Sequence, residues 1–244
     1  TMTESGELHN LRPERFWREL ERGLGEPSPQ AFLATLRSCG ALQVLMPEVD
    51  CLYGVPQSAQ WHPEVDTGVH LELALAQAAR LSAKPEVRFA VLTHDLGKGT
   101  TPQALWPKHN GHEQRGVELI DALTQRLPIP RRFARLARQV ARYHGQAHRA
   151  DELRAATVLK LLDSVDALRR PEGFEDFLAA CEADARGRTG LEDKPYPQAE
   201  RLRWALETVN SVDNDAVPAG LTGEAFGKAL SDLRLRALKA VGFS

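Results

Sequence analysis

The chain has 244 residues, a formal net charge of −2, and 42% hydrophobic and 26% charged residues. This length is enough for one or two domains with a buried core. The nearly balanced charge excludes a general positive field that would attract nucleic acid, so any RNA contact must come from a local patch.

Two further features bear on the compartment. No apolar run approaches the length needed to cross a membrane, and no signal peptide is visible, so we expect a cytoplasmic protein without a membrane partner. The cysteines, Cys39, Cys51 and Cys181, are scattered and form no CxxC pair. We therefore expect reduced, buried thiols, as in a reducing compartment.

Helical periodicity extends along most of the chain. Apolar residues recur at spacings of three and four, and proline or glycine separates the segments. Strand-like alternation is lacking, so we predict an all-α fold. The expected helices cover residues 13–24, 29–39, 41–45, a segment from about 67, 85–96, 113–127, 130–144, 155–170, 172–184, 197–210 and 223–240.

Two irregular segments interrupt this pattern. Residues 97–111 are rich in Gly, Pro and Thr, and loops of this length in a compact domain are often functional. Residues 48–63 include Trp61 and His62, which could line a site or fill a core. We expect these two side chains to fill a core.

The most informative stretch is an apolar run, Phe89–Leu92, that leads to His94 and Asp95, with Gly97 and Lys98 after them. A carboxylate and an imidazole at the edge of a core are costly to bury unless both are paired. A divalent metal can take neutral imidazole nitrogen and carboxylate oxygen together. For this pair alone, a core histidine followed by a C-capping lysine remains the alternative.

The pair has distant companions. His70 lies upstream, and His112, His144 and Asp166 lie downstream, so the chain reads H…HD…H…H…D around the motif HDLGK. This pattern resembles the HD-domain metal-dependent phosphohydrolases. The resemblance implies an HD-domain helical bundle, with N-terminal and C-terminal helical extensions here, and hydrolysis by metal-activated water.

A narrower resemblance covers nearly the whole chain. It is carried by ALQVLMPEVDCLYGVPQ, WHPEVDTGVH, HDLGKGTTPQALWPKHNGHE, DALRRPEGFE and CEADARGRTG. These segments resemble the C-terminal half of bacterial CCA-adding enzymes (tRNA nucleotidyltransferases) of the multifunctional, HD-containing kind. The nucleotidyltransferase head of that family is missing, so we expect no CCA addition by these residues. The resemblance implies a helical neck or body remnant at 1–60, the HD domain at 61–170 and a helical tail at 171–244.

The resemblance also implies an activity. In that family the HD domain hydrolyses 2′,3′-cyclic phosphates and 2′-monophosphates and acts as a general phosphatase. It implies a divalent metal (nickel, cobalt, manganese or magnesium), tRNA as partner, and a phosphate ester or cyclic nucleotide as substrate. Two alternatives remain: a tRNA-binding body with a secondary HD site, and an HD hydrolase of free nucleotides such as dNTPs or alarmones.

We assign the metal ligands to four residues: His70, His94, Asp95 and Asp166. The last has a rival in Asp163. At about 100° per residue, Asp166 falls roughly 90° from the apolar centre of the expected helix, whereas Asp163 falls roughly 150° away. The angle and the resemblance both favour Asp166.

The remaining site residues have less certain roles. We expect catalysis to involve His94, Asp95, Lys98, His112 and His144. His112 and His144 either contact the ligands or phosphate, or complete a second metal site bridged by the HD aspartate. Lys98 either neutralises a phosphate oxygen or caps a helix. Weaker candidates, with exposed loop histidines as the alternative, are His109 and His148.

One helix carries a stripe of positive charge. Its four arginines are spaced by four, three and four residues, which places them on one face. The stripe either holds the tRNA backbone near the metal site or forms a solvated helix face. These residues are Arg131, Arg135, Arg138 and Arg142.

Overall fold

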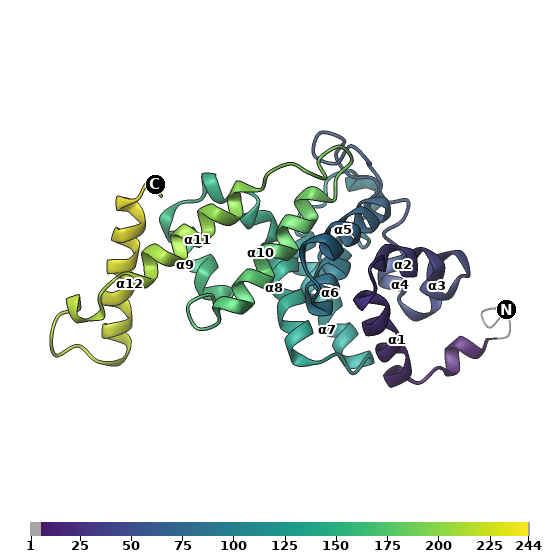
Figure 1. The fold of residues 1–244 in the computed structure, drawn as a ribbon, viewed down its shortest axis with the longest axis horizontal. Helices are drawn as coiled ribbons and strands as arrows, with labels where there is room; N and C mark the ends of the chain where they lie inside the picture. Colours follow the sequence, from purple (N-terminus) through teal and green to yellow (C-terminus); the bar gives the residue numbers. More distant parts are fainter. Residues whose placement is uncertain (1–5, 244) are drawn as a thin grey trace. The chain divides into compact units, whose positions relative to one another are not determined.

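The computed structural model describes residues 6–243. Over these residues helices are the regular secondary structure, with one isolated bridge between Pro56 and Asp66, so the all-α prediction is confirmed (Figure 1). None of the described helices is both long and apolar enough to span a bilayer. The α-helices are α1 (Pro13–Gly25), α2 (Pro29–Ser38), α3 (Ala41–Leu45), α4 (Pro47–Asp50), α5 (Thr67–Leu81), α6 (Pro85–Thr93), α7 (His112–Arg126), α8 (Arg131–Ala147), α9 (Ala155–Ser164), α10 (Pro171–Arg186), α11 (Pro197–Asn210) and α12 (Gly223–Ala240).

Short 3-10 turns join several of these helices. They are η1 (Glu7–Asn10), η2 (Leu96–Lys98), η3 (Gln103–Leu105), η4 (Ala150–Glu152) and η5 (Asn214–Ala216). Most helix starts agree with the sequence, because proline fits the first helical turn, where its missing N–H is not needed. Several helix ends differ: α6 stops at Thr93 and α9 at Ser164, both earlier than expected, whereas α8 continues to Ala147 and α10 to Arg186.

The described chain forms two compact units. The first comprises residues up to 144 together with 179–194, and the second comprises 145–178 together with the residues from 195 onward. The expected division at 60 and 170 concerns family domains rather than packing, and it stays a prediction.

The core of the first unit is aromatic where α1, α6 and α8 meet. Trp17, Phe89 and Phe133 are almost fully buried and pack edge to face, with ring centroids 5.1–5.9 Å apart. Helix α6 also packs against α5, and the two lie side by side in Figure 1. Phe89 thus anchors the helix that leads into the His94–Asp95 pair.

A close backbone approach follows that pair. At Gly97 an added Cβ would lie 2.0 Å from the carbonyl oxygen of His112 and 2.7 Å from the amide of Gly116, both backbone atoms. Only glycine fits here, so η2 packs directly on the first turns of α7. This contact brings the start of α7, and with it His112, to the HD pair.

A second close approach lies at the end of α10. A Cβ on Gly187 would come within 2.4 Å of Ala74 Cα on α5. The glycine allows the segment after α10 to touch the backbone of α5, the helix that carries His70. As a result, residues distant in sequence can reach the same imidazole.

The second unit is built on α9, α11 and α12, which contact one another. Its buried side chains include Val158, Leu162, Leu202 and Leu238.

The cysteines differ from expectation: Cys181 is buried, but Cys39 and Cys51 are exposed. Both lie just after a short helix, where Sγ approaches a carbonyl oxygen three residues earlier in the chain.

Candidate metal centre

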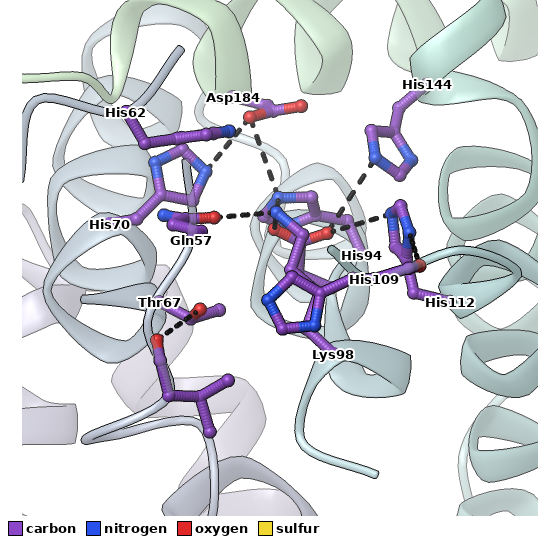
Figure 2. Close-up of polar contacts among 12 residues, drawn as sticks. Gln57, His62, Thr67, His70, His94, Lys98, His109, His112, His144 and Asp184 are labelled. Atoms are coloured by element: carbon purple, nitrogen blue, oxygen red, sulfur yellow. Dashed lines mark hydrogen bonds and ion pairs between the residues drawn. The ribbon is translucent and has the colours of Figure 1, made fainter. Parts of the chain in front are cut away.

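The first unit gathers buried histidines and carboxylates around the HD pair (Figure 2). His70 comes from α5, His94 and Asp95 follow α6, and Asp184 lies on α10. The two imidazoles are fully buried, and the two carboxylates are 2% exposed. His112 and His144, from α7 and α8, approach from the other side in Figure 2.

Backbone carbonyls orient three of the imidazoles. Nδ1 of His94, His112 and His144 lies 2.7, 2.9 and 2.9 Å from a carbonyl oxygen three or four residues earlier in the chain. A carbonyl oxygen only accepts hydrogen bonds, so each Nδ1 carries a proton and each Nε2 is the nitrogen left to bind a metal. This is the arrangement that prepares a histidine to bind a metal through Nε2.

The Nε2 atoms converge on Asp95. Its Oδ2 lies 3.1 Å from His94 Nε2, and its Oδ1 lies 3.5 Å from His112 Nε2 and 3.8 Å from His144 Nε2. Among the described residues, His94 Nε2, His112 Nε2 and Asp95 Oδ1 are buried without a hydrogen-bond partner, and Asp95 Oδ2 is engaged only in ion pairs. Such atoms cost about 1–3 kcal/mol each when left unsatisfied, so their grouping calls for a further partner.

Asp184 faces the other two imidazoles. Its Oδ1 lies 3.0 Å from His70 Nε2 and 3.6 Å from His94 Nε2. Over the described part of the chain, His70, His94 and Asp184 offer ligand atoms that all lie within 4.8 Å of one another. The three residues Asp95, His112 and His144 form a second group of this kind.

The charges of the cluster favour a cation at its centre. Burial alone would lower the pKa of His94, but the carboxylates of Asp95 and Asp184 outweigh burial and raise it to about 10. Burial acts to raise the pKa of Asp95, but His94 and Lys98 hold it well below its ordinary value. Burial lowers the pKa of His144 to about 3, so this imidazole is neutral. A divalent ion would supply the positive charge that a proton on His94 otherwise supplies.

Lys98 takes a different position from either of those expected. Its Nζ lies 2.7 Å from Asp95 Oδ2 and donates to Gln57 Oε1 at 2.8 Å. The ammonium group is therefore engaged with the HD aspartate and is only 7% exposed. His109 is also buried, between the Thr101 hydroxyl and the carbonyl oxygen of Pro56, at 2.9 Å from each.

Asp166 and His148 lie in the second unit. His148 pairs with the Tyr196 hydroxyl at 3.0 Å. Asp166 is in none of the metal-ligand groups found among the described residues. Its carboxylate instead lies 2.6 Å from Arg169 Nε and 3.0 Å from Arg170 Nε.

The angular argument for Asp166 fails because α9 ends at Ser164. Asp166 has φ +59°. Its N–H donates to the carbonyl oxygen of Asp163, and the N–H of Ala167 donates to the carbonyl oxygen of Leu162. This pattern is a Schellman C-cap with aspartate in the left-handed position. A rotation of 100° per residue applies only within a helix. The position of Asp166 therefore cannot be extrapolated from the apolar face of α9, and Asp163 is exposed as expected.

A sequence signal for Asp184 did exist. Phe177, Cys181 and Asp184 follow the i, i+4, i+7 spacing of one helix face, and the first two are apolar and fully buried. An aspartate that continues such a face is a buried carboxylate that needs a partner. The segment CEADARGRTG, which carries part of the family resemblance, contains Cys181 and Asp184, so this spacing is a second signal in the same segment.

The loop before α5 also contributes residues near the cluster. Sequence reasoning did not name Gln57 and Glu64, and it placed His62 in a core, whereas the ring of His62 packs edge-on against His70 at 4.7 Å (Figure 2). Trp61 is 61% exposed, so the expectation that it fills a core is wrong. Val65 has φ +59°, a strained conformation for a β-branched residue that costs about 1–3 kcal/mol.

The arginine stripe lies on α8, and its members differ in their surroundings. Arg131, Arg135 and Arg142 are exposed. Arg138 is partly buried, and its guanidinium forms an ion pair with Asp121 of α7. The stripe therefore presents three exposed cations and one that is already paired.

The fold and the site define the class of protein. An HD domain family model matches residues 67–168, and a model described as "Probable RNA and SrmB- binding site of polymerase A" matches residues 2–52. Residues 67–168 thus match the HD domain family, with all-α structure around the His94–Asp95 pair. The HD match ends before Asp184, so the structure alone brings that carboxylate to the cluster.

Similarity to individual proteins extends over nearly the whole of this chain. Over 98% of its length, the chain is 58% identical to a multifunctional CCA protein of Thioalkalivibrio sulfidiphilus and 55% identical to one of Nitrosococcus oceani. A third relative, from Pseudomonas aeruginosa, is 53% identical over 98% of the chain. Over nearly its whole length the chain is therefore similar to the part of multifunctional CCA proteins that holds the HD domain. It spans 58–59% of the length of these relatives.

Proposed function

We propose that this cluster binds a divalent metal and hydrolyses phosphate esters. The observation that carries the proposal is the group of buried ligand atoms without hydrogen-bond partners, namely His94 Nε2, His112 Nε2 and Asp95 Oδ1, beside Asp95 Oδ2, which is held only by ion pairs. Imidazole nitrogen and carboxylate oxygen together suit divalent ions of borderline softness. Nickel, cobalt or manganese fit this set better than magnesium, which prefers oxygen ligands.

The ligands in this proposal are His70, His94, Asp95 and Asp184. Three of them form one close group, and Asp95 follows His94 with an oxygen 3.1 Å from its Nε2. Asp184 thus takes the role that sequence reasoning gave to Asp166. All four residues are at least 98% buried, so the site is shielded from bulk water.

His112 and His144 are proposed to act beside these ligands. Either they share Asp95 with a second ion or they contact the phosphate of the substrate, as the sequence suggested. His112 is the more exposed, with 16% of its side chain accessible, compared with 7% for His144. We therefore assign the phosphate contact to His112. Lys98 holds the Asp95 carboxylate in place rather than the phosphate.

The chemistry combines what an ion supplies with what the chain positions. When bound, a divalent ion acts as a Lewis acid that activates water and polarises a phosphoryl oxygen. The carbonyl contacts of Nδ1 keep the Nε2 atoms directed inward, and Lys98 keeps Asp95 ionised and oriented. No separate nucleophilic side chain is required, so we propose direct attack of water on phosphorus.

The proposed substrate is a tRNA 3′ end that carries a 2′,3′-cyclic phosphate or a 2′-phosphate. Three observations support an RNA substrate: the names of the relatives refer to CCA, the model that matches residues 2–52 is described as RNA-binding, and α8 presents exposed arginines. The same observations favour a second candidate function, a tRNA-binding body in which the HD site is secondary.

An assay panel tests the proposal. Purified protein is incubated with a 2′,3′-cyclic nucleotide, 2′-AMP and a dNTP, each without metal and with each of the four ions. We expect metal-dependent hydrolysis of the first two substrates. Absence of hydrolysis with every ion, together with tight tRNA binding, would favour the RNA-binding function, whereas a preference for dNTPs would favour a hydrolase of free nucleotides.

A further inference from the structure

The loop before α5 places another carboxylate beside the cluster. Glu64 Oε1 lies 3.1 Å from His62 Nδ1 and 3.1 Å from His70 Nδ1, and its side chain is 1% exposed. Its second oxygen accepts a hydrogen bond from the Thr189 amide at 3.4 Å. Two imidazoles and a backbone amide therefore surround a carboxylate that lies outside both the HD pattern and the proposed ligand set.

The contacts of His70 show that this group is not a metal site of its own. His62, Glu64 and His70 are close enough to hold an ion, but His70 Nδ1 also lies 2.9 Å from the carbonyl oxygen of Gly187. That oxygen only accepts, so Nδ1 carries the proton and cannot bind an ion. The free nitrogen of this imidazole is Nε2, which faces Asp184 at 3.0 Å.

We infer that Glu64 is a positioning residue that holds His70 in the tautomer with Nε2 free and strengthens that nitrogen as a metal ligand. The inference rests on the proposed metal centre. A carboxylate beside the N–H of a ligand histidine raises the basicity of the opposite nitrogen and fixes the ring orientation. The Gly187 carbonyl can select the tautomer, but only Glu64 adds a negative charge.

The backbone around Glu64 is held firmly. The Gln57 amide donates to the Val65 carbonyl at 2.8 Å, and the Val65 amide donates to the His62 carbonyl at 2.9 Å. These bonds keep Val65 in its left-handed conformation. The strain lies next to Glu64, where it serves to direct the carboxylate at the two imidazoles.

The same loop joins both parts of the cluster. The side-chain amide of Gln57 donates through Nε2 to Glu64 Oε1 at 3.4 Å, and its Oε1 accepts a hydrogen bond from Lys98 Nζ at 2.8 Å. Lys98 in turn pairs with Asp95. One loop residue thus connects the carboxylate behind His70 with the lysine that holds Asp95, and Figure 2 shows Gln57 between His70 and Lys98.

The test compares Glu64→Gln with the wild-type protein in two measurements that do not involve hydrolysis. The first is affinity for Mn²⁺ and Ni²⁺ in a competition titration, where we expect a loss of about 10–100-fold. The second is the ¹⁵N NMR signature of the His70 ring in metal-free protein, where we expect Nδ1–H to dominate in the wild type. In the Glu64→Gln variant we expect a smaller population of that tautomer, or a ¹⁵N chemical shift of Nε2 that differs from the wild-type value.

A matched control is Glu113→Gln. Glu113 also lies beside the Nδ1 of a cluster histidine, but at 3.5 Å from His112 and with 34% of its side chain exposed. Water screens such a contact, so we expect unchanged metal affinity within about twofold. Equal affinity of wild type and Glu64→Gln would overturn the inference.

Two further outcomes separate the possible failures. A wild-type protein that binds no divalent ion contradicts the proposed function, while the NMR measurement still tests the effect of Glu64 on His70. If Glu64→Gln alters folding, Glu64→Asp retains the charge, and we expect it to retain more metal affinity than Glu64→Gln at equal thermal stability. If the loss of metal affinity in both variants is proportional to their loss of thermal stability, Glu64 serves packing alone and the inference is overturned.

Discussion

Two aspartates occupy equivalent places in the chain and have opposite surroundings. Asp95 lies two residues after the end of α6, and Asp166 lies two residues after the end of α9. Asp95 is 2% exposed and faces three imidazole nitrogens at 3.1, 3.5 and 3.8 Å and one ammonium group at 2.7 Å. Asp166 is 20% exposed and is paired with two exposed arginines that follow it in sequence.

The backbone explains the difference. Asp166 adopts φ +59° and closes a Schellman cap, and its side chain pairs with the local Arg169 and Arg170. Asp95 has φ −108° and leads into η2, which Gly97 presses against α7. The chain after α6 is thus directed into the core. A carboxylate that is buried among imidazoles is thus a candidate site residue. A carboxylate whose hydrogen bonds are satisfied by near neighbours and water instead belongs to a helix end.

The largest expected effect is at the HD pair itself. His94→Ala and Asp95→Ala should each reduce metal-dependent hydrolysis of a cyclic nucleotide to background, because each removes a proposed ligand of the ion that activates water. The helical content, measured by circular dichroism, should stay near that of the wild type. Near wild-type turnover with metal bound in either variant would contradict the proposed site.

The next prediction separates Asp184 from Asp166. Asp184→Asn should lose most bound metal, measured by elemental analysis of protein purified without chelator, since it removes a ligand charge from the buried group. Asp166→Asn should keep its metal, because asparagine also tolerates the left-handed conformation and only two surface ion pairs are weakened. The reverse pattern would restore Asp166 as the ligand and remove Asp184 from the site.

Lys98 provides an intermediate effect. Lys98→Met leaves the buried Asp95 without its cation, so the metal-free protein should lose about 3–5 kcal/mol of unfolding free energy in urea. Added Mn²⁺ should restore more stability to the variant than to the wild type, because the ion replaces the missing charge. If metal stabilises both proteins equally, the ion does not bind at Asp95.

The smallest effect is expected on the surface of α8. The double variant Arg135→Glu and Arg142→Glu should weaken tRNA binding and make the slope of log K against log[salt] less negative by about 1.4–1.8, for two lost phosphate contacts. Hydrolysis of a small cyclic nucleotide should be unchanged. Arg138→Gln is the control, since Asp121 already neutralises Arg138. Identical slopes in all three proteins would identify the stripe as a solvated face.

Local features of the site could be predicted well. The apolar run before His94 led to the burial of the HD pair, and the HD pattern named His70, His112 and His144, which the structure brings around it. The helix starts at Pro13, Pro29 and Pro85 were likewise predictable. These features depend on nearest neighbours along the chain, where helical periodicity and proline geometry act directly.

The residues that were missed depend on contacts between distant segments. Asp184 meets His70 across 114 positions, and Lys98 meets Gln57 across 41. No periodicity relates such residues, and the choice between Asp184 and Asp166 depended on where α9 ends and how its cap turns the chain.

The amino-acid sequence by itself thus determined the helices and the burial of the histidine–aspartate pair through local spacing, and its motifs carried the family resemblance. Only the tertiary structure decided which carboxylate faces His70 and His94, which cation pairs with Asp95 and which carboxylate lies behind His70. Two glycine contacts, at Gly97 and Gly187, let backbones approach closely enough for those side chains to meet. Such packing depends on the shape of the whole unit, which no single segment of the sequence specifies.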